Sequence, residues 1–168
     1  MNGIWKLLEK IIRFILEKTV HINISADQWN GLVQFIKFGI VGLSNTVISY
    51  LLYVGVLLIF QKKQWIPSID YLVAQVIAFV LSVLWSFYWN NKYVFKQNEG
   101  QERNIFAALL KTYVSYAFTG LFLNSVLSFI WVEVIGLSKL IAPIINLLVS
   151  VPINFLMNKF WAFKTESK

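Results

Sequence analysis

Four long apolar runs constrain the fold of this chain more than any other feature. They cover about residues 35–60, 69–90, 107–132 and 140–160, and charged residues lie mainly at their ends. A bilayer core about 30 Å thick needs roughly 20 helical residues, so each run is long enough to cross it. Hydrophobic residues make up 58% of the 168 residues, more than in a soluble domain. The runs therefore predict an all-α integral membrane protein with four transmembrane helices.

The residues outside the runs complete the predicted domain organisation. Residues 1–33 are expected to form an amphipathic helix over 4–19 and a polar connector over 20–31. The helix has one apolar face and one face that carries Lys6, Lys10 and Arg13, which is typical of a helix lying in the membrane interface. Residues 34–164 form the four-helix membrane domain, and residues 165–168 form a short tail.

The second and fourth runs end in related sequences, 68 residues apart. Residues 82–96 read SVLWSFYWNNKYVFK, and residues 150–164 read SVPINFLMNKFWAFK. Six aligned positions are identical, among them the pairs Asn90/Asn158 and Phe95/Phe163. Matched polar residues at a fixed spacing indicate an internal duplication. Because each copy contains two spans, both enter the membrane in the same sense, which predicts two parallel two-helix repeats.

The positive charges predict the orientation of these repeats. Twelve of the 15 lysines and arginines fall at the N-terminal end, between the second and third runs, or at the C-terminal end. The three others are Lys62, Lys63 and Lys139. Basic residues concentrate on the cytoplasmic side of membrane proteins, so both termini are predicted to be cytoplasmic.

Polar side chains in the duplicated segments form the candidate binding site. Residues four apart share one helix face, which gives two polar ladders: Ser82, Ser86 and Asn90, and Ser150, Asn154 and Asn158. Further amides are Asn45 and Asn91, and cations stand at the cytoplasmic ends as Lys37, Lys92, Lys111 and Lys159. Amides suit sugar hydroxyls, and lysine supplies a point charge for phosphate. The alternative is that the ladders only join helices and the lysines only extend to the interface.

Several classes of function find no support in the composition. The chain has no cysteine and one histidine, so it offers no metal-ligand cluster, cofactor motif or nucleophile–base pair. We predict no catalytic residues, no metal and no cofactor. The net charge of +7 accompanies apolar spans, which favours anionic lipid headgroups over nucleic acid as partners.

The segments FIKFGIVGLSNT, SFYWNNKYVFK and NFLMNKFWAFK resemble the GtrA-like family over about residues 34–164. The resemblance implies a bacterial cytoplasmic-membrane translocase (flippase) that moves a polyprenyl-phosphate-linked monosaccharide to the outer leaflet. A separate polyprenyl glycosyltransferase would use that sugar to decorate a cell-surface polysaccharide. The motif positions are Asn90, Lys92 and Phe95, then Asn158 and Phe163. Asn91 and Phe160 stand where family members commonly carry basic residues, which reduces the charge expected at the phosphate.

Translocation is therefore the predicted function, and a membrane anchor or scaffold that recruits a glycosyltransferase without moving lipid is the alternative. Neither hypothesis needs an enzymatic activity in this chain. We also consider a homodimer, because four helices enclose little space and Gly39 and Gly42 would allow another helix to approach closely.

Overall fold

The computed structural model describes residues 25–97 and 99–167, together with Gly3, Leu7, Lys10, Ile11 and Phe14. Most of the predicted amphipathic helix at 4–19 lies outside the described residues. The chain divides into two units, Met1–Ile36 and Lys37–Lys168. Within the described part, four helical stretches are long and apolar enough to cross a membrane, at residues 26–63, 70–94, 105–134 and 142–162. The predicted all-helical class with four apolar helices is confirmed.

Helix α2, Ala26–Lys63, is longer than the first predicted span. Ser25 and Gln28 exchange two bonds: the Gln28 N–H donates to Ser25 Oγ (3.3 Å), and the Ser25 N–H donates to Gln28 Oε1 (3.0 Å). This reciprocal capping box starts a helix well before its apolar part. The predicted connector at 20–31 is therefore wrong from Ala26 onward, because a polar turn with its own cap extends the span.

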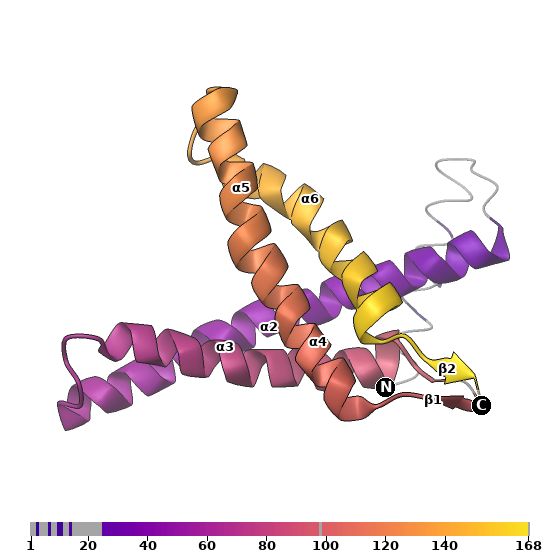
Figure 1. The fold of residues 1–168 in the computed structure, drawn as a ribbon, viewed down its shortest axis with the longest axis horizontal. Coiled ribbons are helices and arrows are strands. Elements are labelled where there is room, and N and C mark those ends of the chain that lie inside the picture. The colour runs from indigo at the N-terminus through magenta and orange to yellow at the C-terminus, as the bar shows by residue number, and fades with distance from the viewer. Residues whose placement is uncertain are drawn as a thin grey trace. The chain divides into compact units, whose positions relative to one another are not determined.

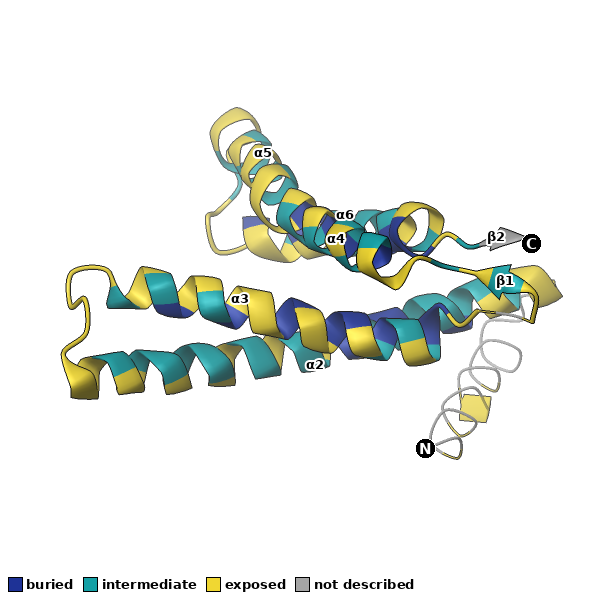
Figure 2. Ribbon diagram, turned by 60° about the horizontal axis from the view of Figure 1, so that its bottom comes forward, coloured by how far each residue is buried: buried dark blue, intermediate teal, exposed yellow. Residues whose placement is uncertain are grey.

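Helix α3, Asp70–Trp89, follows α2 after a short turn and continues into a π-helical turn, η2, Asn90–Val94. Among the residues of the second unit, Trp85 Nε1 of α3 donates to Ser44 Oγ of α2 at 3.2 Å. Figure 2 shows the buried residues of α3 gathering toward the end of that helix.

The third and fourth spans form a second helical hairpin (Figure 1). The third is one continuous run, with Asn104 capping its first turn, made of α4 (Ile105–Ala117), η3 (Phe118–Leu123), α5 (Asn124–Phe129) and η4 (Ile130–Val134). Gly136 then adopts φ +79°, which favours glycine, at the turn between the spans. The fourth consists of α6 (Ala142–Met157) and η5 (Asn158–Ala162). Asn146 Nδ2 joins the two spans by donating to Ser128 Oγ at 2.7 Å.

Helix α4 contacts both α3 and the fourth span. Its buried residues are small and fall on one seam, which Thr119 of η3 continues: Ala108, Thr112 and Ser115. The three hydroxyls donate to carbonyls four residues earlier at 2.8–2.9 Å, so they are satisfied within their own helix. Small side chains with satisfied hydroxyls allow neighbouring helices to approach closely.

A short antiparallel ribbon joins the ends of the two hairpins. Strand β1, Gln101–Glu102, pairs with β2, Glu166–Ser167 (Figure 1). Because β1 follows η2 and β2 follows η5, the last turns of the second and fourth spans lie at the same end of this unit.

Candidate functional site

The first polar ladder is buried beside α4. Ser82, Ser86 and Asn90 are at most 2% exposed. Ser86 Oγ lies 2.5 Å from the Tyr116 hydroxyl, and Asn90 Nδ2 donates to Ser86 Oγ at 3.2 Å. Asn90 and Ser86 therefore form a polar chain that reaches Tyr116 in the third span.

The second ladder is also largely buried. Ser150 and Asn158 are buried, and Asn154 is half-buried. Asn158 Nδ2 donates to the Asn154 carbonyl at 2.8 Å and to Asn154 Oδ1 at 3.0 Å. The Oδ1 atoms of both Asn90 and Asn158 are buried and accept no hydrogen bond from the described residues.

Both asparagines begin a π-helical turn. The Phe95 N–H donates to the Asn90 carbonyl at 2.8 Å, and the Phe163 N–H donates to the Asn158 carbonyl at 2.8 Å. These bonds span five residues, so each turn is one residue wider than an α-helical turn. The wider turns leave Phe95 and Phe163 buried, at 4% and 3% exposure.

The two phenylalanines meet in a reciprocal aromatic cluster. Their ring centroids lie 4.7 Å apart and the rings are stacked. Phe95 also stacks on Phe155 (5.9 Å), and Phe163 stacks on Phe87 (5.4 Å). Phe87 and Phe155 are themselves a pair in the 68-residue register. Each copy of the segment therefore places its last phenylalanine on the phenylalanine of the other copy.

Arg103 fastens the polar loop to this cluster. Its Nη1 donates to Asn91 Oδ1 at 2.7 Å, and its Nη2 donates to the Phe95 carbonyl at 3.0 Å. The guanidinium carbon lies 5.0 Å from the centroid of the Phe163 ring. A planar cation with several donors can make these contacts at once, which lysine cannot do. Burial lowers the pKa of Arg103, but arginine remains charged at neutral pH.

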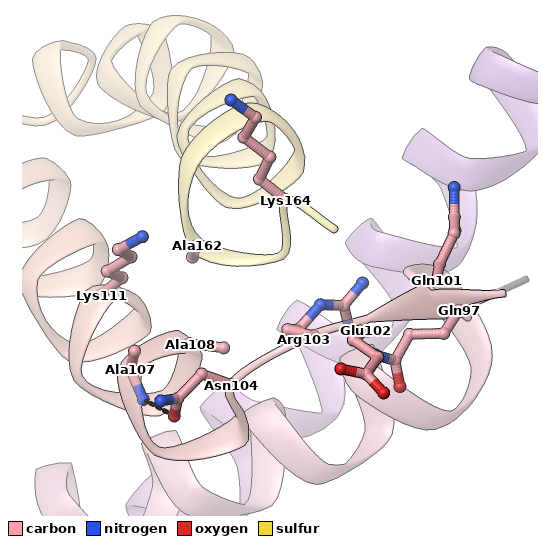
Figure 3. A pocket seen from close by; sticks show the side chains of 10 residues that line it. All are labelled: Gln97, Gln101, Glu102, Arg103, Asn104, Ala107, Ala108, Lys111, Ala162 and Lys164. Carbon is pink, nitrogen blue, oxygen red and sulfur yellow. Dashed lines mark hydrogen bonds between the residues drawn. The ribbon is translucent and has the colours of Figure 1, made fainter. Parts of the chain in front are cut away.

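A cavity of about 870 Å³ opens beside Arg103. Figure 3 shows Lys111 of α4 on one side, Lys164 after η5 on another, and Arg103 between α4 and β1. The remaining lining residues are Gln97, Gln101, Glu102, Asn104, Ala107, Ala108 and Ala162. Three cations and three amides against one carboxylate make this cationic cavity suitable for an anion that also carries hydroxyl groups.

The four lysines predicted to bind phosphate do not all lie at the cationic cavity. Lys111 lines the cationic cavity, whereas Lys37, Lys92 and Lys159 do not. Lys92 Nζ donates to the Tyr88 hydroxyl at 2.9 Å, and Lys159 Nζ lies 5.5 Å from the centroid of the Phe155 ring. Neither polar ladder lines this cavity, and Asn45 lines a second cavity elsewhere.

Two of the three cations that line the cationic cavity, Arg103 and Lys164, are absent from the predicted site. Lys164 was detectable, because it matches Lys96 in the 68-residue register. Arg103 lies in a polar loop, and only its contacts with Asn91 and Phe163 show that it reaches the site. No group of three or more histidine, aspartate or glutamate residues in the described segments could hold a metal ion.

These features define a multi-pass helical membrane protein with a cationic cavity at one end of its membrane domain. The GtrA/DPMS transmembrane domain matches residues 37–163, most of the chain. The protein belongs to this family, as the duplicated motifs indicate.

The chain is also similar to a dolichol-phosphate mannosyltransferase from Pyrococcus furiosus. The two are 29% identical over 138 residues, which cover 80% of this chain and 36% of the mannosyltransferase. This chain thus matches about a third of that longer protein.

Proposed function

We propose that this protein moves a polyprenyl-phosphate-linked monosaccharide from the cytoplasmic to the outer leaflet of a bacterial cytoplasmic membrane. The observation that carries the proposal is the cationic cavity, where Arg103, Lys111 and Lys164 surround a space next to the ends of two apolar spans. A lipid-linked phosphate combines an anionic group with a tail that stays in the hydrocarbon. The relative's name adds support, because a dolichol-phosphate mannosyltransferase makes a product of this chemical class.

In this proposal the phosphate binds at the cytoplasmic face, near Lys111 and Lys164. The sugar then meets amides rather than water, first those of the cavity wall and then the side-chain amides of Asn90 and Asn158. The Oδ1 atoms of these two asparagines accept no hydrogen bond from the described residues. The reciprocal contacts of the aromatic cluster favour two parallel repeats around a pseudo-two-fold axis. Rearrangement of one repeat against the other would carry the headgroup outward.

The test is transport in vesicles of purified protein and polyprenyl-phosphate mannose with a radiolabelled sugar. Impermeant periodate, added outside, oxidises only the sugars that reach the outer leaflet. The wild-type protein should expose the inner pool, and Lys111→Gln with Lys164→Gln should slow that exposure at least tenfold. Lys62→Gln with Lys63→Gln, exposed at the end of α2, is the matched control and should change the rate less than twofold. Wild-type rates in the cavity variant would reject the site, and no exposure by the wild type would reject the function.

A scaffold that recruits a glycosyltransferase is the second candidate. It is favoured by the partial match, because the relative carries its matching segment within a longer chain named as a transferase. A scaffold should lose polysaccharide glycosylation when residues 1–30 are deleted and tolerate Asn90→Ala. A translocase should show the opposite pattern, with protein levels in the membrane checked for both variants.

A further inference from the structure

A second cavity lies between α2 and α3 and differs in character from the cationic one. Its volume is about 550 Å³. Besides Ala78, its walls consist of amides, hydroxyls and tyrosines, with no charged side chain: Asn45, Thr46, Ser49, Tyr50, Tyr53 and Gln75. It shares no residue with the cationic cavity. We call it the neutral groove.

The neutral groove lies deep within the first span. Ser49 follows Lys37 by twelve residues and precedes Lys62 by thirteen. At 1.5 Å per residue, it is about 18–20 Å from each of these cations along the helix. In a hydrocarbon core about 30 Å thick, this position is close to the middle of the membrane.

Polar groups at this depth need partners. The buried Asn45 Oδ1 accepts no hydrogen bond from the described residues, and Thr46 donates to the carbonyl of Gly42 at 3.2 Å within its own helix. An unsatisfied polar group is costly in hydrocarbon. A groove that gathers six polar side chains there is therefore suited to a polar occupant.

The chemistry of the walls selects the kind of occupant. Amides and hydroxyls both donate and accept, as sugar hydroxyls do, and the tyrosines present apolar rings with polar ends. Without a cation, the walls offer no point charge for phosphate. The volume lies within the range of about 300–1,000 Å³ typical of small-molecule sites.

We propose that the neutral groove is a subsite for the uncharged sugar of the lipid-phosphate sugar as it passes the middle of the bilayer. The inference rests on the proposed translocation and separates two recognition tasks. The cationic cavity binds the phosphate at the membrane face, and the neutral groove replaces water around the sugar at the point of highest cost.

The absence of cysteine allows a direct test. Ser49→Cys places one thiol in the groove, and Leu51→Cys, at a side chain that is 59% exposed on the same helix, is the matched control at similar depth. Thiol reagents attack the thiolate, which forms where water reaches. In vesicles of the full chain, a charged thiol reagent should label Ser49→Cys and leave Leu51→Cys unlabelled.

The inference predicts selective protection. Polyprenyl-phosphate mannose should slow labelling of Ser49→Cys at least fivefold, and polyprenyl phosphate without a sugar should slow it less than twofold. Asn45→Cys repeats the measurement should Ser49→Cys express poorly. Equal protection by both lipids, no labelling, or a disulfide between two copies of Ser49→Cys would overturn the inference, the last because a second copy would then cover the groove.

A failure of the neutral-groove inference can be told apart from a failure of the proposed translocation. Wild-type translocation is measured in the same vesicles by periodate exposure. Transport with no protection at Ser49→Cys rejects the neutral groove alone, whereas protection without transport supports the sugar subsite and rejects translocation.

Discussion

At the scale of single residues, Arg103 makes two hydrogen bonds at this site although the sequence did not predict it as a site residue. Its two bonded nitrogens connect the loop to η2 and to the Phe95 carbonyl, and its guanidinium carbon lies 5.0 Å from the centroid of the Phe163 ring. Arg103→Lys keeps the charge and loses this geometry. Hydrogen bonds made by charged groups contribute about 1.5–3 kcal/mol each, and because Arg103 is half-buried, we expect a loss of about 1–3 kcal/mol in the free energy of unfolding.

Unfolding in mixed micelles, followed by tryptophan fluorescence, measures that loss. Lys164→Gln is the control, because Lys164 is an exposed side chain of the same cavity. It should weaken lipid-phosphate binding and leave stability within about 0.5 kcal/mol, as is usual for surface substitutions. Equal stability of Arg103→Lys and the wild type would show that the charge alone matters.

Asn158 allows stability to be separated from function. Its Oδ1 is buried without a partner among the described residues, and an unpaired group of this kind costs about 1–3 kcal/mol. Asn158→Leu, of similar size, removes this cost together with the two bonds that Nδ2 donates to Asn154. Because the two effects oppose each other, stability should change by less than about 1 kcal/mol, while transport should fall at least tenfold. A stable variant with normal transport would assign Asn158 to helix packing only, the alternative that the sequence left open.

The sequence singled out Asn90 and Asn158 because the duplication marks them, and both side chains are buried in the structure. It did not predict that they begin π-turns, since a π-turn depends on where the following phenylalanine finds its packing partners. Arg103 was missed because its partners, Asn91 and Phe163, come from two different spans. Such contacts depend on how the two spans pack against each other, and the sequence of one repeat alone does not determine that packing.

At the scale of elements, the aromatic cluster predicts equal coupling between the two duplicated segments. Aromatic pairs contribute about 0.5–1.5 kcal/mol beyond simple burial. Double-mutant cycles on Phe95/Phe155 and on Phe163/Phe87 should give coupling energies in this range that agree within about 0.5 kcal/mol. Phe95 with Phe60, which makes an edge-to-face contact with Trp65 near the C-terminal end of α2, should show additive effects. Strong coupling in one cycle only would argue against a pseudo-two-fold arrangement.

The helix boundaries show which features of these elements hydropathy predicts and which it does not. Apolar length located the four helices because the bilayer fixes that length. The start of α2 at Ala26 followed instead from the bonds between Ser25 and Gln28. Hydropathy does not register such caps, so the polar first turns of α2 were assigned to a connector.

At the scale of the whole molecule, the β1–β2 ribbon and the distribution of charge make one joint prediction about topology. Pairing of Glu102 with Glu166 requires the loop after the second span and the tail after the fourth to lie on the same side. The excess of lysine and arginine near those segments predicts that this side is the cytoplasm.

In spheroplasts, an impermeant thiol reagent should therefore label Ser68→Cys and Ser138→Cys, which lie in the two opposite turns. The reagent should label Glu99→Cys and Thr165→Cys only after the membrane is opened. Labelling of Glu99→Cys and Thr165→Cys from different sides would contradict the ribbon and the parallel repeats. Labelling of both from outside would retain the fold but reverse the direction of transport, because the cationic cavity would then face the outer leaflet.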